Sequence, residues 1–291
     1  MKPGEPSRTA LLVARQRAAH QLLDRGAILD DPLAVKILRE DEKDLLQFAG
    51  AHPLASIGRL FTAARSRIAE DAASAAVEKG TRQIVILGAG LDTFALRTSP
   101  GAHPIRIYEV DHPATQAWKR QCLAEAHLAL PPSLIFAPVD FERDDLADAL
   151  SLAGFQRNAP AFFTWLGVVP YLTHDAVTGT LDYIASIPNA EVAFDYMEPP
   201  EAFSEEMRES VARRTEQLDK LDERWASRFS PDAMAATLRS HGFSAIEDFD
   251  FQEIRSRFGA AVQGLAPGHA GLHVVHARTA FLHPSSLTTH G

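Results

Sequence analysis

The feature that most constrains the fold is a short apolar run that enters a glycine-rich turn at residues 84–93. Ile84 to Leu87 is predicted to form a buried strand, and Gly88-Ala89-Gly90 follows it directly. Glycines allow a tight turn and let a ligand lie against the backbone. A strand, a glycine turn and a helix start are typical of the opening unit of a nucleotide-binding α/β domain. An ordinary strand-turn-helix corner has the same pattern, so the glycines alone leave both interpretations open.

Six further strands are predicted downstream of this turn, most of them separated by helices. The strands are expected at residues 105–110, 134–139, 161–165, 192–194, 245–249 and 274–281, and the helices at 113–130, 143–153 and 175–187. Short apolar runs separated by helices indicate an α/β fold, with a mostly parallel sheet covered on both faces. No convincing helix is predicted between the last two strands. We therefore expect those two strands to pair antiparallel or to lie apart.

The first 80 residues show helical patterns and no strand. Helices are predicted over residues 7–25, 32–38 and 53–79, the last with apolar residues at three- and four-residue spacing. A long, highly charged helix is also predicted over 201–228, after the fifth strand. With no internal repeat and no obvious linker, we expect a single domain over residues 1–291. It would consist of a helical extension (1–80) and a Rossmann-like core (81–291) with a helical insert near 200–229.

Charge and composition narrow the range of partners. The chain has 38 Asp and Glu residues against 29 Lys and Arg residues, a net charge of -9 and no basic run. This balance would repel a phosphate backbone, so nucleic acid is not expected as a partner. No apolar run approaches the ~18 residues of a membrane span, and the N-terminus lacks a signal-peptide core. With one cysteine, Cys122, an internal disulfide is impossible, and we expect a cytoplasmic protein whose oligomeric state is open.

Acidic residues end the second and third predicted strands. Glu109-Val110-Asp111 comes about 20 residues after the glycines, where a carboxylate accepts hydrogen bonds from ribose hydroxyls. We expect one of the two acids to face the ligand and the other to face away, and we choose Asp111. The third strand ends in Val139-Asp140-Phe141, where a carboxylate beside an aromatic ring suits an adenine. The alternatives are a turn-forming Asp111 and an Asp140 that caps the next helix.

Thr93 disfavours one common class of nucleotide-binding enzyme. A dinucleotide-binding fingerprint has a third glycine at this position. The acidic end of the third strand also fits a nicotinamide dinucleotide poorly. An NAD(P)-dependent oxidoreductase nevertheless remains an alternative function, because Asp111 would suit its ribose equally well.

Four segments, taken together, carry a family resemblance. They are Ile86–Thr93, Tyr108–Pro113, Val139–Phe141 and Gly167–Thr173. In these segments the chain resembles the leucine carboxyl methyltransferase-like family of bacterial class I S-adenosylmethionine-dependent O-methyltransferases, and the likeness spans most of its length. The resemblance implies a seven-stranded sheet with an antiparallel last strand, S-adenosylmethionine as cofactor, and methyl transfer to a small-molecule carboxylate or hydroxyl.

The resemblance also implies which residues bind the cofactor. Gly88, in the turn with Ala89 and Gly90, would line its methionine part; Asp111 would bind the ribose; Asp140 and Phe141 would border the adenine; and Arg65 would hold the carboxylate. An arginine suits that role because a guanidinium can bind a carboxylate through two parallel hydrogen bonds. The alternative for Arg65 is a surface arginine whose stem covers the apolar stripe of its helix.

Leu166 departs from the family pattern. The eukaryotic branch has a glutamate at this place, whose polar contact a leucine cannot make. We include Leu166 among the cofactor-binding residues, where Trp165 and Leu166 would form an apolar wall. The alternatives are plain core packing of both residues and a non-catalytic binding protein that keeps the fold.

No catalytic base and no metal site are assigned from the sequence. A carboxylate acceptor needs no base, whereas a hydroxyl usually does. His20, Tyr171, His174 and Tyr196 are candidates among which the sequence does not choose. The late histidines lack the spacing of a zinc-binding helix, so no metal is expected.

Overall fold

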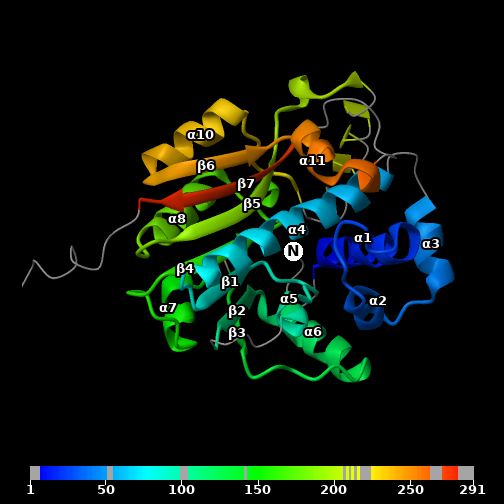
Figure 1. Cartoon of the computed structure of the whole chain (residues 1–291), viewed down its shortest axis with the longest axis horizontal. Helices are drawn as coiled ribbons and strands as arrows, with labels where there is room; N and C mark the ends of the chain where they lie inside the picture. Colours follow the sequence, from blue (N-terminus) through cyan, green and yellow to red (C-terminus); the bar gives the residue numbers. More distant parts are fainter. Residues whose placement is uncertain are drawn as a thin grey trace, which may run out of the picture.

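The protein is described here by a computed structural model covering residues 7–50, 55–98, 104–140, 143–205, 208–209, 211–212, 215–216, 224–262 and 271–280. A seven-stranded sheet forms its centre (Figure 1). The strands are β1 (Gln83–Leu87), β2 (Arg106–Asp111), β3 (Leu134–Pro138), β4 (Ala161–Trp165), β5 (Glu191–Met197), β6 (Phe243–Phe249) and β7 (Leu272–Thr279), in the spatial order β3-β2-β1-β4-β5-β7-β6. The five strands from β3 to β5 run parallel, and β7 is antiparallel to both of its neighbours. The predicted fold class is confirmed.

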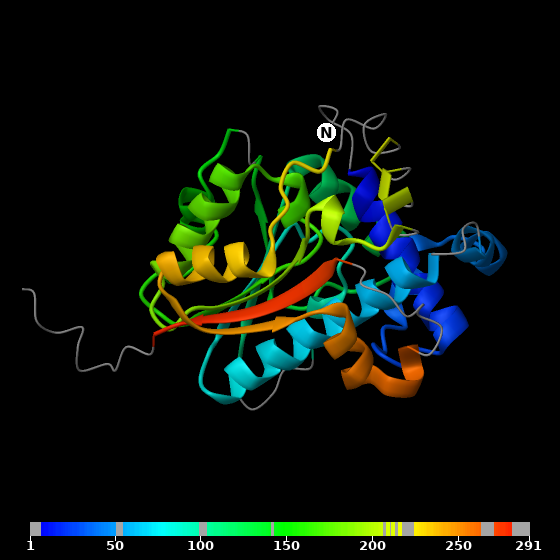
Figure 2. The same cartoon turned by 90° about the horizontal axis from the view of Figure 1, so that it is seen from above.

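Helices cover both faces of this sheet. They are α4 (Ala55–Glu78), α5 (Phe94–Arg97), α6 (Pro113–Glu125), α7 (Leu146–Leu152), α8 (His174–Ala185), α10 (Pro231–Ser240) and α11 (Phe251–Phe258). Figure 2 shows α8 and α10 on one side of the sheet and α4 and α11 on the other.

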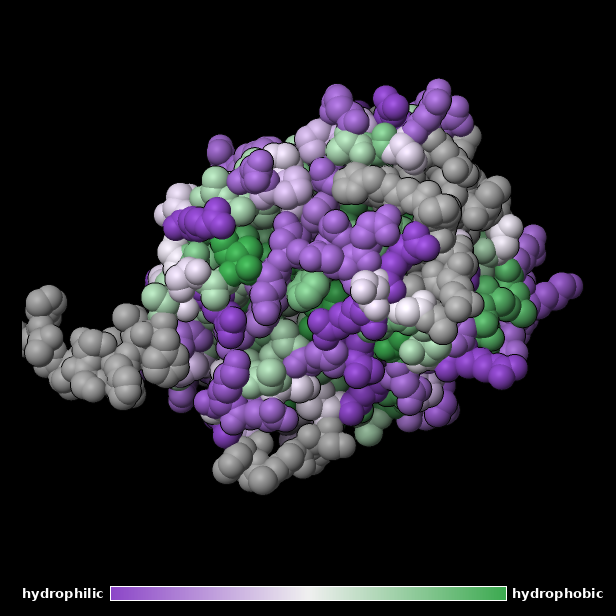
Figure 3. Space-filling model, turned by 45° about the horizontal axis from the view of Figure 1, so that its top comes forward, coloured by the Kyte–Doolittle hydropathy of each residue, from purple (hydrophilic) through white to green (hydrophobic). Residues whose placement is uncertain are grey.

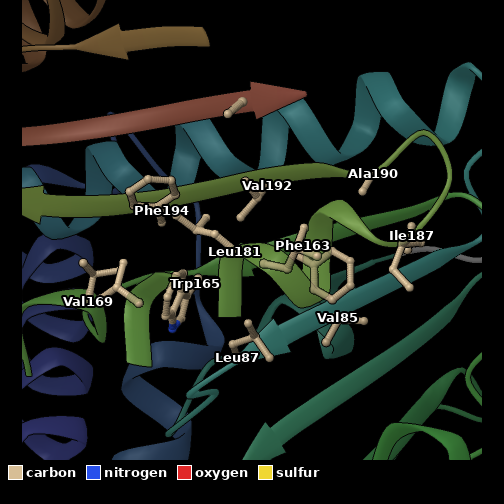
Figure 4. Close-up of a cluster of buried hydrophobic side chains, with 14 of the residues drawn as sticks. Val85, Leu87, Phe163, Trp165, Val169, Leu181, Ile187, Ala190, Val192 and Phe194 are labelled. Carbon is tan, nitrogen blue, oxygen red and sulfur yellow. The ribbon is translucent and has the colours of Figure 1, made fainter. Parts of the chain in front are cut away.

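Alternating residues of each strand supply the two apolar layers. Val85, Phe163 and Val192 pack in one core cluster with residues of α7, α8 and α10 (Figure 4). The neighbouring residues Ile84 and Phe162 point the other way and pack under α4 and α5. Strands buried on both faces show continuous apolar runs, which is why their positions were predictable from the sequence.

The N-terminal segment is helical as predicted. It consists of α1 (Arg8–Asp24), α2 (Leu33–Leu38), α3 (Glu42–Gly50) and α4, of which α3 was not predicted. The Ser7 side chain caps α1 by accepting a hydrogen bond from the Ala10 N–H. α1, α2 and α3 gather at one end of the molecule, whereas α4 runs along one face of the sheet (Figure 1). None of the described helices is long and apolar enough to cross a membrane.

Two sequence predictions about the C-terminal half are wrong. A helix, α11, does separate β6 from β7, and Asp250 and Glu253 form a capping box at its start. α11 lies beside α4 (Figure 2), and β6 and β7 still pair antiparallel, as predicted. The charged helix predicted over 201–228 does not extend that far, because residues 224–230 are outside any helix. Of its other residues, 208–209, 211–212 and 215–216 are helical, and the rest of 206–223 lie outside the described residues.

Two predicted helix boundaries also differ. α6 ends at Glu125, short of residue 130, and the backbone of His127 is left-handed (φ 52°). α7 begins at Leu146 after its cap Asp145, later than residue 143.

The space-filling view shows mostly hydrophilic side chains, with hydrophobic ones in separate small areas (Figure 3). The described residues on that face therefore form no broad apolar surface.

Candidate functional site

A cavity of about 630 Å³ lies at the carboxyl ends of the central parallel strands. Its lining includes the glycine turn after β1, the ends of β2 and β4, residues just beyond β3, and side chains of α1 and α4. The order of the strands reverses between β1 and β4. Doubly wound sheets bind ligands at this edge and at this reversal point, and the volume is typical of a small-molecule site.

The structure brings the predicted cofactor-binding residues together. The predicted residues that line this one cavity are Arg65, Gly88, Ala89, Gly90, Asp111, Asp140 and Leu166. Phe141 lies outside the described residues. The role of each residue toward a cofactor stays a prediction.

The glycines of the turn are needed for packing as well as for conformation. Gly88 and Gly90 have left-handed backbones, with φ of 69° and 47°. A Cβ on Gly88 would collide with Cγ2 of Val168, in the loop after β4. A Cβ on Gly90 would lie 3.1 Å from the Cβ of Ala10 on α1. Because these two residues have no side chain, Val168 and Ala10 can pack directly against the turn. A larger residue at either glycine would push its neighbour away.

Asp111 joins the end of β2 to the glycine turn. Its Oδ2 accepts a hydrogen bond from the Gly90 N–H at 2.6 Å, and its Oδ1 accepts one from the His112 N–H at 2.7 Å. Burial raises the pKa of the Asp111 carboxyl, and these two backbone hydrogen bonds oppose the rise. Because each carboxylate oxygen accepts more than one hydrogen bond, the side chain retains capacity toward a ligand in the cavity.

Glu109 differs from Asp111 in depth and not in the face it occupies. The expectation that the two acids face opposite ways is wrong, because residues two apart on a strand share a face. Glu109 is buried under α6, where its Oε2 accepts from the Lys119 Nζ at 2.6 Å. Burial raises the pKa of Glu109 to about 7, against the attraction of Lys119. Glu109 does not line the cavity, so this perturbed pKa belongs to a buried ion pair.

Asp140 is not the cap of the following helix. That position belongs to Asp145, whose side chain accepts from the Asp148 N–H. The carboxylate of Asp140 is half-buried at the cavity, with Oδ2 3.7 Å from Arg143 Nε and 4.0 Å from His112 Nε2. The capping alternative is therefore excluded.

Arg65 points inward from α4. It is 7% exposed, and its Nη1 donates to Oδ2 of Asp195 on β5 at 2.7 Å. Its Nε is buried without a hydrogen-bond partner among the described residues. The alternative of a surface arginine is excluded, and a buried cation reaches the cavity.

A buried charge cluster beside the turn was not predicted from the sequence. Arg17 of α1 donates to Asp92 Oδ2 and to Asp31 Oδ2, both at 2.6 Å. Thr93 Oγ1 donates to Asp31, and Arg97 contacts both Thr93 and Asp31. Burial opposes protonation of Arg17, but Asp92 and Asp31 outweigh it and raise its pKa.

This cluster explains why Asp92-Thr93 follows the glycines. The two residues attach α1 to the turn, and α1 forms one wall of the cavity. Both residues belong to the Ile86–Thr93 segment that carries the family resemblance, and this was the available signal in the sequence. Nothing in the sequence around Arg17 indicates its partners.

Of the four candidate bases predicted from the sequence, one lies at the cavity. Tyr171 lines the cavity, whereas His20, His174 and Tyr196 do not. His20 is buried between the Asp24 carboxylate and the backbone of Leu29, and the Tyr196 hydroxyl donates to Asp248.

The two residues of the predicted apolar wall lie on different faces of the sheet. Leu166 lines the cavity, whereas Trp165 packs in the core on the other face of the sheet. Within the described parts of the chain, no group of three His, Cys, Asp or Glu residues could hold a metal ion.

The strand order, the antiparallel β7 and the cavity at the strand ends define the class I methyltransferase fold. A solved structure from Thermobifida fusca, described as an inferred methyltransferase, superimposes with a TM-score of 0.58 at 18% identity, covering 96% of each chain. This likeness shows the fold.

Sequence comparison identifies the family. The leucine carboxyl methyltransferase family matches residues 10–185. YktD of Bacillus subtilis is 28% identical over 302 residues, covering 95% of this chain and 99% of YktD. A relative from Mycolicibacterium paratuberculosis is 32% identical over 230 residues, covering 72% and 71% of the two chains. Both carry names of inferred S-adenosyl-L-methionine-dependent methyltransferases. The chain belongs to the leucine carboxyl methyltransferase family.

Proposed function

We propose that this enzyme transfers a methyl group from S-adenosylmethionine to a carboxylate or hydroxyl oxygen of a small molecule. The observation that carries the proposal is the convergence of Arg65, the glycine turn, Asp111 and Asp140 on one cavity. Family membership and the names of its relatives support the same cofactor.

The residues of the cavity fit the chemistry of that cofactor. A guanidinium has five N–H donors, and Arg65 has one hydrogen bond, to Asp195, among the described residues. Donors are therefore left for a carboxylate. Asp111 and Asp140 supply acceptors at the ends of neighbouring strands, suited to ribose hydroxyls and an adenine amino group. The backbone of Gly88 and Gly90 lines the same cavity.

The contribution of the protein to the reaction is orientation. S-adenosylmethionine, when bound, supplies a methyl group activated by a sulfonium. In-line transfer requires that the acceptor oxygen be held close and aligned, and holding reactants in this way lowers the barrier substantially. We assign the walls from α1 and from the loop after β4 to this task, because both face the glycine turn. Side chains of α1 and Arg65 of α4 line the cavity together with residues of the sheet, which supports a single domain over residues 1–291.

The acceptor decides whether a base is needed. A carboxylate is ionised at neutral pH and attacks without proton removal. Arg224 lines the cavity and would attract such an anion, whereas the charge of Arg17, which also lines it, is already balanced by Asp92 and Asp31. A hydroxyl acceptor would need its proton taken up, and Tyr171 is the candidate from the earlier set that lies at the cavity.

Calorimetry with S-adenosylhomocysteine tests the proposal. The wild-type protein should bind it, and no binding at millimolar ligand would refute the proposed cofactor. Asp111→Ala should abolish binding while circular dichroism shows the fold retained. Wild-type affinity in that variant would remove Asp111 from the site.

Two other functions give different results. An NAD(P)-dependent oxidoreductase would bind NADH in a fluorescence titration, whereas we expect no binding. A non-catalytic protein on this fold would show no methyl transfer to any pool of extract metabolites.

A further inference from the structure

Asp195 holds two walls of the cavity together without lining it. Its Oδ2 accepts from Arg65 Nη1 at 2.7 Å, and its Oδ1 accepts from the Gly167 N–H at 2.5 Å. Arg65 lies on α4, Asp195 on β5, and Gly167 in the loop after β4. Asp195 is 4% exposed and is absent from the cavity lining. One buried carboxylate thus fixes a cation and a loop that do line the cavity.

The position of the Arg65 guanidinium is tightly confined. Gly167 has a left-handed backbone, with φ 71°. A Cβ on Gly167 would lie 2.7 Å from Arg65 Nη2 and 3.1 Å from Nη1. The guanidinium therefore rests against bare backbone on one side and is bound to Asp195 by one of its nitrogens.

This arrangement orients the remaining donors of the arginine. A long side chain has several rotamers, and bidentate binding of a carboxylate requires the guanidinium plane to be fixed. Residues that orient a binding side chain commonly contribute to affinity even though they do not touch the ligand. The ion pair is buried, so solvent screens it little.

We propose that Asp195 is a positioning residue that sets Arg65 for the amino-acid carboxylate of the cofactor, an inference that rests on the proposed function. The carboxylate of Asp195 also lowers the net positive charge at Arg65, which by itself would weaken anion binding. We expect orientation to outweigh this effect, because the guanidinium packs against the Gly167 backbone and its hydrogen bond to Asp195 fixes the direction of Nη1.

Two ligands that differ in the amino-acid part test the inference by calorimetry. S-adenosylhomocysteine carries the carboxylate, whereas 5′-methylthioadenosine retains the nucleoside and sulfur but lacks it. Asp195→Asn keeps the acceptor for Gly167 and places an amide N–H₂ opposite Arg65. We expect its dissociation constant for S-adenosylhomocysteine to rise about tenfold, with that for 5′-methylthioadenosine unchanged.

Asp24→Asn is the matched control. Asp24 also binds an arginine of α4, Arg59, at 2.8 Å, and neither residue lines the cavity. Its affinity for both ligands should equal that of the wild type. If Asp195→Asn does not fold, Gly167→Ala moves the same guanidinium and should show the same selective loss.

Each outcome bears on one proposal. Unchanged or tighter binding of S-adenosylhomocysteine by Asp195→Asn would overturn the positioning role. An equal loss for both ligands would also overturn it, because it would indicate general disruption of the cavity. Failure of the wild-type protein to bind either ligand would instead refute the proposed cofactor.

Discussion

Replacing Asp31 by asparagine tests the buried charge cluster that attaches the N-terminal helices to the glycine turn. Asp31 is fully buried between α1 and α2. Its Oδ2 accepts from Arg17 Nη2 at 2.6 Å, and its Oδ1 lies 3.1 Å from Arg97 Nε. The Thr93 hydroxyl donates to the same carboxylate at 2.7 Å. Asparagine has nearly the same shape but one acceptor oxygen.

The expected cost follows from these contacts. At least one charge-assisted hydrogen bond is lost, worth about 1.5–3 kcal/mol, and a buried guanidinium N–H then faces a donor, at about 1–3 kcal/mol. We expect the free energy of unfolding to fall by about 3–5 kcal/mol, the range for removing one partner of a buried ion pair. This is a large part of the about 5–15 kcal/mol that stabilises a typical protein.

Urea unfolding followed by circular dichroism measures this loss. Asp30→Asn is the control, because Asp30 is the adjacent residue and is exposed; it should change the free energy of unfolding by no more than about 0.5 kcal/mol. Combining Asp31→Asn with Thr93→Val should cost less than the sum of the two single changes, since the Thr93 hydroxyl donates to the carboxylate that Asp31→Asn alters. Equal stability of the Asp31 and Asp30 variants would refute the reasoning.

Two further predictions concern the glycine turn and the antiparallel edge of the sheet. Gly88→Ala places a Cβ against Val168 on a left-handed backbone, so chemical denaturation should show a loss of about 1–3 kcal/mol. A Val168→Ala background should reduce that loss, and an unchanged loss would exclude the contact as its cause. Burial of the His273 imidazole opposes protonation, but hydrogen bonds to Asp248 and Glu198 outweigh it and raise its pKa. A raised pKa stabilises the fold fully below the unfolded value of about 6.5 and loses this effect as pH rises through the folded-state pKa. The stability difference between wild type and His273→Gln should therefore shrink above about pH 6.5, and a pH-independent difference would contradict the assignment.

The sheet and much of the candidate site were predictable because their signals are local. Ile84–Leu87 is apolar throughout because that strand is buried on both faces. Asp111 and Asp140 could be placed together because the carboxyl ends of parallel strands meet at one edge. The helix α11 was missed because it is short, although the capping pair Asp250 and Glu253 was visible in the sequence.

By itself, the sequence determined the α/β class, the position of the cavity at the strand ends and several of the residues that line it. Only the tertiary structure decided which charged groups meet there. Arg65 and Asp195 are 130 residues apart in the chain, and Arg17 lies 75 residues from Asp92. Strand and turn patterns depend on neighbouring residues, whereas such pairs depend on how α1 and α4 pack against the sheet. No local pattern records that packing, so the partners of a buried charge appear only once the fold has brought them together.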